Sequence, residues 1–114
     1  MQGLNQVFLL GNVGKDPELR KVNDETSVVS FPLATTTSHK DKNGDRQDVT
    51  EWHNIVAWRG VADNIAKIVK KGDRITINGA LKTRSWESKE GDKRYITEVI
   101  ADSFLKLTSS NAEQ

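Results

Sequence analysis

The stretch from Arg74 to Trp86 alternates between apolar and polar residues more regularly than any other part of this chain. Because successive side chains of a strand point to opposite faces, this alternation predicts a β-strand. At about 13 residues, the segment is longer than a typical strand. Gly79, which lies near its middle, therefore predicts a bend or a bulge.

Four other segments also have strand-like sequence. They are residues 6–10, 29–37, 52–58 and 95–100, the last of which continues toward residue 107. The first is a nearly continuous apolar run closed by Gly11, and it predicts a strand buried on both faces. In the second, Pro32 has no N–H group to donate to a neighbouring strand. We therefore expect Pro32 to lie at a sheet edge or at a bulge.

One helix and two hairpin tips complete the pattern. Apolar residues recur at the spacing of an amphipathic helix. They are Val61, Ile65, Ile68 and Val69. We expect this helix to end with Lys70 and Lys71, whose charges favour its C-terminal dipole, and with Gly72 as its left-handed cap. The polar segments 40–45 and 88–93 contain glycine, in the first case after asparagine, and predict hairpin tips.

In chain order, these elements are three strands, one helix and two strands. Together with the long bent fourth strand and the large hairpins, this order predicts an all-β domain with one helix. We expect a five-stranded OB-fold barrel with long β-hairpin arms and with the helix between strands three and four. Residues 1–107 are expected to form this domain, and the small polar residues 108–114 a short disordered tail.

The composition excludes several functional classes. The chain has 114 residues, enough for one domain, and no cysteine, which excludes disulfide scaffolds and thiolate metal sites. Its histidines, His39 and His53, have no nearby pattern of ligands, so we expect no metal and no cofactor. No serine or threonine has a histidine and an acid at suggestive spacing, and we expect no enzyme. No apolar run reaches the roughly 20 residues of a membrane span, and no signal peptide fits before Val7, so we expect neither a membrane anchor nor secretion.

The tryptophans carry most of the information about function. Alternation places Trp52 and Trp58 on one face of their predicted strand. It likewise places Lys82, Arg84 and Trp86 on one face of theirs. Bases of an unpaired nucleic-acid strand stack on aromatic rings, and their phosphates pair with lysine and arginine. Aromatic rings interleaved with cations therefore predict a groove for single-stranded nucleic acid.

Basic residues are concentrated in the same part of the chain. Between residues 67 and 84 the only acid is Asp73. The basic residues there are Lys67, Lys70, Lys71, Arg74, Lys82 and Arg84. A locally basic surface on a nearly neutral protein favours a bound polyanion. The alternative is that the three tryptophans belong to the core and that the charges form an ordinary solvated face.

Several short motifs resemble the bacterial-type single-stranded DNA-binding protein family. They include residues 5–7, 11–20, 50–53, 70–72, 79–86 and 95–99, and the resemblance covers roughly residues 4 to 107. It implies an OB fold, a homotetramer, and a nucleoid-associated protein of the bacterial cytoplasm. It also implies sequence-tolerant binding and protection of single-stranded DNA in replication, recombination and repair.

The resemblance assigns roles to individual residues. Trp52, Trp58 and Trp86 match the family's base-stacking positions. The residues that match or lie among its phosphate-contacting positions are Lys70, Lys71, Arg74, Lys82 and Arg84, with Arg20 as a weaker candidate. His39 stands where well-known relatives carry a tryptophan, so its smaller ring is expected to weaken one stacking platform. His53 matches a histidine near subunit contacts, and we assign it to assembly.

Two implications concern partner proteins. The family commonly ends in a long flexible tail with an acidic, apolar tip that recruits replication proteins, whereas this chain ends at residues 111–114 without one. Either the chain is truncated or it is a short member, and the missing tip argues against recruitment of replication and repair proteins. The alternative function is that of the related primosomal adaptors, which bridge replication proteins, often as dimers, and bind nucleic acid weakly. The three tryptophans argue against that alternative.

Overall fold

The computed structural model describes residues 2–108, which form six strands and one helix. The elements are β1 (Val7–Val13), β2 (Glu18–Asn23), β3 (Thr26–Lys40), β4 (Arg46–Trp58), α1 (Arg59–Ile68), β5 (Arg74–Glu87) and β6 (Lys93–Thr108). Within the described part of the chain, α1 is too short to cross a membrane. The predicted tail lies outside the described residues, apart from Thr108 at the end of β6.

Five of the strands close into a barrel in the order β1-β5-β6-β4-β3. The ring closes where β3 returns to β1, with Asn12 opposite Ala34 and Val13 opposite Leu33. Helix α1 follows β4 and packs mainly against β3 and β4. The predicted OB-fold barrel, with its helix after the third of the five barrel strands, is therefore confirmed.

Strand β2 was missing from the predicted order. It pairs with β3 beyond the point where β3 leaves β1, so it lies outside the closed ring. All six of its residues are exposed, and its sequence ELRKVN has no regular alternation. A strand whose residues are all exposed leaves little hydrophobic pattern in the sequence.

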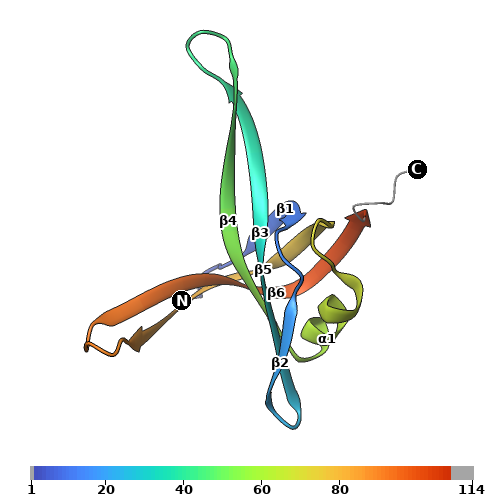
Figure 1. Ribbon diagram of the computed structural model, residues 1–114, viewed down its shortest axis with the longest axis vertical. Helices are drawn as coiled ribbons and strands as arrows, with labels where there is room; N and C mark the ends of the chain where they lie inside the picture. Colours follow the sequence, from blue (N-terminus) through green and yellow to red (C-terminus); the bar gives the residue numbers. More distant parts are fainter. Residues whose placement is uncertain (1, 109–114) are drawn as a thin grey trace.

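Two long hairpins leave the barrel in different directions, β3–β4 toward the top of the view and β5–β6 toward the left (Figure 1). Both predicted tips are confirmed. The first closes through the Asp41 N–H, which donates to the Asp45 carbonyl at 2.9 Å, and the second through the Ser88 N–H, which donates to the Asp92 carbonyl at 2.8 Å. Gly44 has a left-handed φ of 85°, which suits glycine at such a tip.

The core lies inside the barrel and under α1. It is formed by Val13, Val29, Phe31, Leu33, Ile55, Ala57, Ala62, Ile65, Val69, Ile75, Ile77, Val99 and Ala101. The prediction that the first strand is buried on both faces is wrong for the single chain. Val7 and Leu9 pack against the core, whereas Phe8 is 68% and Leu10 42% exposed on the opposite face. The strand also continues beyond Gly11 to Val13.

The helix ends at Ile68, earlier than predicted, and Lys70 and Lys71 lie in the turn that follows it. Val69 already has extended backbone angles and is buried. Its side chain therefore enters the core from the segment after the helix and not from the helix itself. Gly72 does have a left-handed φ of 91°, but in the turn before β5 and not as the helix cap.

Buried Asp73 holds this turn together. Its carboxylate accepts a hydrogen bond from the Lys70 N–H at 2.8 Å and pairs with the Lys106 ammonium at 3.3 Å. Lys106 also donates to the Ile68 carbonyl at 3.0 Å, so it satisfies one of the free carbonyls at the helix end. The one acid within the basic segment therefore has a structural role.

The bulge predicted at Gly79 is present, whereas Pro32 lies at neither an outer sheet edge nor a register shift but in a gap in the pairing of β3. The β5–β6 register shifts between Asn78 and Gly79, which confirms the bulge. The Pro32 carbonyl accepts a hydrogen bond from the Gly14 N–H at 2.9 Å, in the gap where β3 changes its partner from β1 to β2. A residue's N–H and carbonyl face the same side of a strand, so the missing N–H of proline falls in this gap.

Candidate nucleic-acid interface

The three tryptophans lie on the surface. Trp52 is 62%, Trp58 43% and Trp86 46% exposed. The alternative that they are core residues is therefore excluded. Each of the three side chains is therefore partly covered by the protein and partly accessible for stacking.

A groove runs across the outside of the barrel, over strands β2, β3, β4 and β6, and reaches β5 at one end. Its floor is Ser30, Val56 and Glu98, which line both halves. These residues face outward because their neighbours Val29, Ile55 and Val99 point into the core. The groove is therefore a direct product of the strand alternation.

One half of the groove, about 540 Å³ in volume, is rich in cations. Arg20, Trp58, Lys82 and Arg84 all contribute to its lining. The structure thus brings together four of the residues predicted to bind nucleic acid, from three different strands. Arg20, the weakest of these candidates in the sequence, reaches the groove because β2 pairs with β3.

The other half, about 670 Å³ in volume, has a different lining. Its walls include Pro32, Asn54 and Ile96, and its charged residues are Lys15, Asp16, Glu18 and Glu98. Lys15, Ser30 and Glu98 were not among the residues predicted from the sequence. A signal for Glu98 was present, since the predicted hairpin tip at residues 88–93 places it within about one residue of Lys82 across the hairpin.

Trp52, a residue of β4, lies beside this second half, and its ring packs against the linker that joins β1 to β2. A methyl group built on Gly14 would lie 2.5 Å from Cζ3 of the Trp52 ring and 3.3 Å from Cγ of Pro32. The ring therefore rests against Gly14, next to Pro32 of the groove wall. Only glycine leaves room for the ring at this position.

Trp86 lies on the β5–β6 arm, two residues beyond Arg84 on the same face. The Arg84 guanidinium carbon is 5.6 Å from the centre of the Trp86 ring, within the range of a cation–π contact. Arg84 also forms two hydrogen bonds with Glu98, Nε to Oε1 at 3.1 Å and Nη2 to Oε2 at 3.2 Å. Arg84 is thus not a free cation but one fixed between a carboxylate and an aromatic ring.

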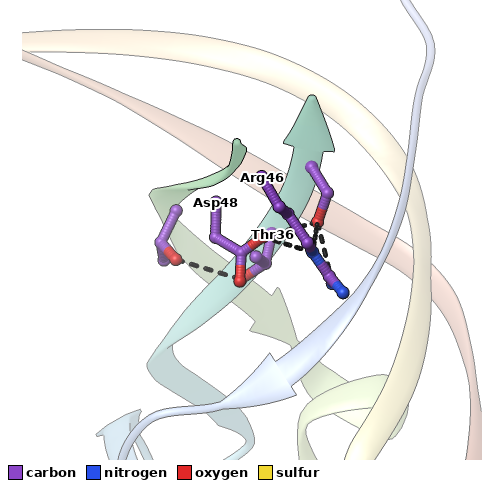
Figure 2. A network of polar contacts seen from close by, with 5 residues as sticks. Thr36, Arg46 and Asp48 are labelled. Carbon is purple, nitrogen blue, oxygen red and sulfur yellow. Dashed lines mark hydrogen bonds and ion pairs between the residues drawn. The ribbon is translucent and has the colours of Figure 1, made fainter. Parts of the chain in front are cut away.

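A network of polar contacts extends along the β3–β4 arm on the same face as Trp52 (Figure 2). The Ser38 hydroxyl donates to Asp48 Oδ1 at 2.6 Å, and Arg46 Nε donates to the same oxygen at 3.2 Å. These contacts, the serine hydrogen bond first, lower the pKa of Asp48 from its usual value. Next to them Thr36 and Thr50 share a hydrogen bond of 3.0 Å. This ladder orders the arm beyond the barrel.

His39 is not brought together with the tryptophans. It lies near the tip of the β3–β4 arm, opposite Gln47. The alternation places His39 and Gln47 on the face of the arm opposite the one that carries Trp52 and the Asp48 network. Its predicted role as a weak stacking platform stays a prediction.

The remaining candidates lie around the turn between α1 and β5. The Lys71 N–H donates to Asp16 Oδ1 at 2.7 Å, which places Lys71 next to the second half of the groove. Arg74 lies on the outer face of β5, 3.4 Å from the Asn12 side-chain oxygen. The groove lining does not include Lys70, Lys71 or Arg74.

His53 points to the opposite side of β4 from Trp52 and is partly buried. Its Nε2 is 2.8 Å from the Thr35 hydroxyl, at the base of the β3–β4 arm. The predicted contribution of His53 to a subunit contact stays a prediction. Among residues 2–108, no three His, Cys, Asp or Glu side chains are placed to hold a metal ion.

Residues 4–107 match the Single-strand binding protein family. The chain belongs to this family. It is 45% identical over 112 residues to Single-stranded DNA-binding protein 1 of Chlorobaculum tepidum. The aligned region covers 97% of this chain and 69% of that protein. It is 44% identical over 108 residues to Single-stranded DNA-binding protein 1 of Xylella fastidiosa, covering 94% of this chain and 79% of that protein.

Solved structures of single-strand binding proteins have the same fold. The Plasmodium falciparum SSB in complex with ssDNA superimposes with a TM-score of 0.86 at 32% identity, over 94% of this chain and 97% of that chain. A deletion mutant of the Thermus aquaticus single-stranded DNA binding protein gives a TM-score of 0.81 at 28% identity, over 92% of this chain and 51% of that chain.

The position of Trp52 against Gly14 gives a testable prediction for this family member. Gly14→Ala is expected to weaken binding of a dT oligonucleotide about tenfold, because the new methyl group displaces the ring and part of the roughly 1–3 kcal/mol of stacking is lost. The fold should survive, since the atoms met first belong to an exposed side chain. In a Trp52→Ala background, the same Gly14→Ala change should have no further effect. An equal loss in that background would show that Gly14 does not act through Trp52.

Proposed function

We propose that this protein binds and protects single-stranded DNA, without catalysis and with little regard to base sequence, in bacterial replication, recombination and repair. The observation that carries the proposal is the half of the groove in which exposed Trp58 lies among Arg20, Lys82 and Arg84. A stacking surface surrounded by cations fits a base and its flanking phosphates. The two relatives at 44–45% identity are bacterial proteins named for single-stranded DNA binding, and the proposed location is the nucleoid in the cytoplasm.

The surface features form one continuous path for a DNA strand. The path begins at Trp86 on the β5–β6 arm and passes Arg84 into the cationic half of the groove at Trp58. It then crosses the shared floor to Pro32, beside which Trp52 rests. Each stacked base is expected to contribute about 1–3 kcal/mol, and the cations add a term that weakens steeply with salt. We propose that residues 1–107 suffice for this binding.

A competition experiment tests the proposed function. A fluorescently labelled dT oligonucleotide is bound to the protein and then displaced by unlabelled single-stranded or duplex DNA of the same length. Single-stranded DNA of mixed sequence should displace the label nearly as well as dT, whereas duplex DNA should displace it poorly. Equal displacement by duplex DNA would overturn the proposal, because stacking on the tryptophans requires unpaired bases.

We further propose that the protein is a homotetramer, with an apolar sheet face as one of its subunit contacts. On the side of β1, β5 and β6 opposite the core, Leu10, Thr76 and Leu105 lie in register across the three strands. Leu105 is 64% and neighbouring Phe8 68% exposed. An apolar sheet face of this kind is typical of a surface that is covered in an assembly. His53 is proposed to contribute to a separate subunit contact.

Phe8→Asp should dissociate the assembly, because a charge on the covered face has to be desolvated on association. We expect native mass spectrometry to show a smaller species for this variant and a tetramer for the wild type. Leu19→Asp, which changes an exposed leucine on β2 outside this face, should leave the mass of the assembly unchanged. A wild-type dimer that binds oligonucleotides weakly would instead favour the primosomal adaptor.

A further inference from the structure

A carboxylate lies in the floor of the groove that is proposed to hold a polyanion. Glu98 lines both halves of the groove, and its side chain is only 11% exposed. It stands directly across the β5–β6 ladder from Lys82. A negative charge at this position repels phosphate and offsets part of the attraction due to the neighbouring cations. For a site that binds DNA, this placement is unfavourable unless the carboxylate contributes something else.

The contacts of Glu98 show what it contributes. Its two oxygens receive Nε and Nη2 of Arg84 at 3.1 and 3.2 Å, a bidentate arrangement that fixes the plane of the guanidinium. This arrangement occupies one edge of the guanidinium and leaves Nη1 available to a phosphate. The same guanidinium lies 5.6 Å from the centre of the Trp86 ring. Glu98 therefore orders Arg84 and, through Arg84, the ring of Trp86.

We propose that Glu98 is a positioning residue of the DNA groove. It weakens the electrostatic attraction of the groove for phosphate, and it orders the side chains of Arg84 and Trp86. It holds Arg84 against Trp86 in advance of binding, and so lowers the cost of ordering these side chains when DNA arrives. Its charge also makes the groove less attractive to phosphate at low salt. The inference rests on the proposed function and adds a determinant of how binding depends on salt.

The test is the dependence of dT oligonucleotide affinity on salt for the wild type and for Glu98→Gln. Glutamine keeps the shape of the side chain but removes its charge and one of its two acceptors for Arg84. One additional neutralised phosphate steepens the slope of log affinity against log salt concentration by about 0.7. The affinity of the variant relative to the wild type should therefore fall about fivefold between about 50 and 500 mM salt. The variant should bind more tightly at the low end and more weakly at the high end, where the loss of positioning dominates.

Two controls separate this role from a general effect of charge and from simple stabilisation of the arm. Glu90→Gln removes the same charge from the exposed loop of the same arm, outside the groove lining, and should leave the salt slope unchanged. In an Arg84→Gln background, Glu98→Gln should tighten binding at every salt concentration, because no guanidinium remains to be positioned. Thermal unfolding of each variant reports whether the Arg84–Glu98 pair merely stabilises the arm.

The possible failures are distinguishable. If the wild type fails to bind dT oligonucleotides, the proposed function is wrong, and the role of Glu98 falls with it. If the wild type binds but Glu98→Gln has the same salt slope as Glu90→Gln, only the role of Glu98 is wrong. A slope change without any loss of affinity at high salt would contradict the positioning role, because it would leave charge alone as the effect of Glu98.

Discussion

The variant with both Trp58→Ala and Trp86→Ala is expected to bind a dT oligonucleotide at least about 30-fold more weakly than the wild type. Each removed platform costs about 1–3 kcal/mol of stacking, and the two rings lie at consecutive positions on the proposed path. The fold should change little, since the rings are 43% and 46% exposed. Fluorescence anisotropy of a labelled oligonucleotide measures the binding, and urea denaturation measures the stability.

Tyr95 provides a matched control on the same arm. It pairs with Ser85, so the alternation places it on the face opposite Trp86, and it is 64% exposed. Tyr95→Ala removes a similar aromatic surface and should weaken binding less than about threefold, because no base stacks on that face. A loss as large as that of the tryptophan variant would mean that the proposed path has been placed on the wrong face. Unfolding of the tryptophan variant would mean that the rings stabilise the fold.

Gly79→Ala is expected to destabilise the protein by about 3 kcal/mol, a large part of the roughly 5–15 kcal/mol by which a folded domain is stable. A methyl group on Gly79 would lie 2.0 Å from the Ile100 carbonyl oxygen and 3.0 Å from the Ala101 Cα. Both are backbone atoms of β6, so the clash cannot be relieved by a side-chain rotation. Equilibrium denaturation in urea, followed by circular dichroism, gives the change.

Gly60 is the control for this substitution. It lies in α1, and a methyl group there would meet no atom within 4 Å. Gly60→Ala should therefore be neutral or stabilise the protein by up to about 1 kcal/mol, as expected for alanine in a helix. If Gly79→Ala and Gly60→Ala had similar stabilities, the tight β5–β6 crossing at the bulge would be contradicted.

The features predicted most successfully were those with a local physical signal. Alternation in residues 74–86, together with one glycine, predicted both the length of β5 and its bulge. The glycine-containing polar segments predicted the hairpin tips, and the order of the elements predicted the barrel. Each of these depends on neighbouring residues, for which the sequence pattern is informative.

The errors arose where the local pattern depends on distant contacts. Strand β2 is held by pairing to β3 and carries no alternation of its own. The apolar run of β1 was interpreted as doubly buried, although Phe8 and Leu10 face outward in the single chain. The helix ends before Val69, and the turn that follows it is held by the hydrogen bond from the Lys70 N–H to Asp73. None of these contacts is visible in sequence spacing.

The candidate site was predicted in part. The alternation identified Trp52, Trp58, Lys82, Arg84 and Trp86 as exposed residues of two strands. It did not show that Arg84 is already paired with Glu98, because that contact depends on the register of β6 against β5. Nor did it bring Arg20 into the groove, since this requires β2.

The most direct test of the proposed DNA path is a titration of the protein's own tryptophan fluorescence with a dT oligonucleotide at low salt. Stacked bases quench tryptophan, so strong quenching that saturates at a defined ratio of DNA to protein is expected. A duplex of the same length should produce little quenching under the same conditions. If dT binds without quenching, or if duplex DNA quenches equally, the exposed tryptophans are not the surface on which single-stranded DNA is held.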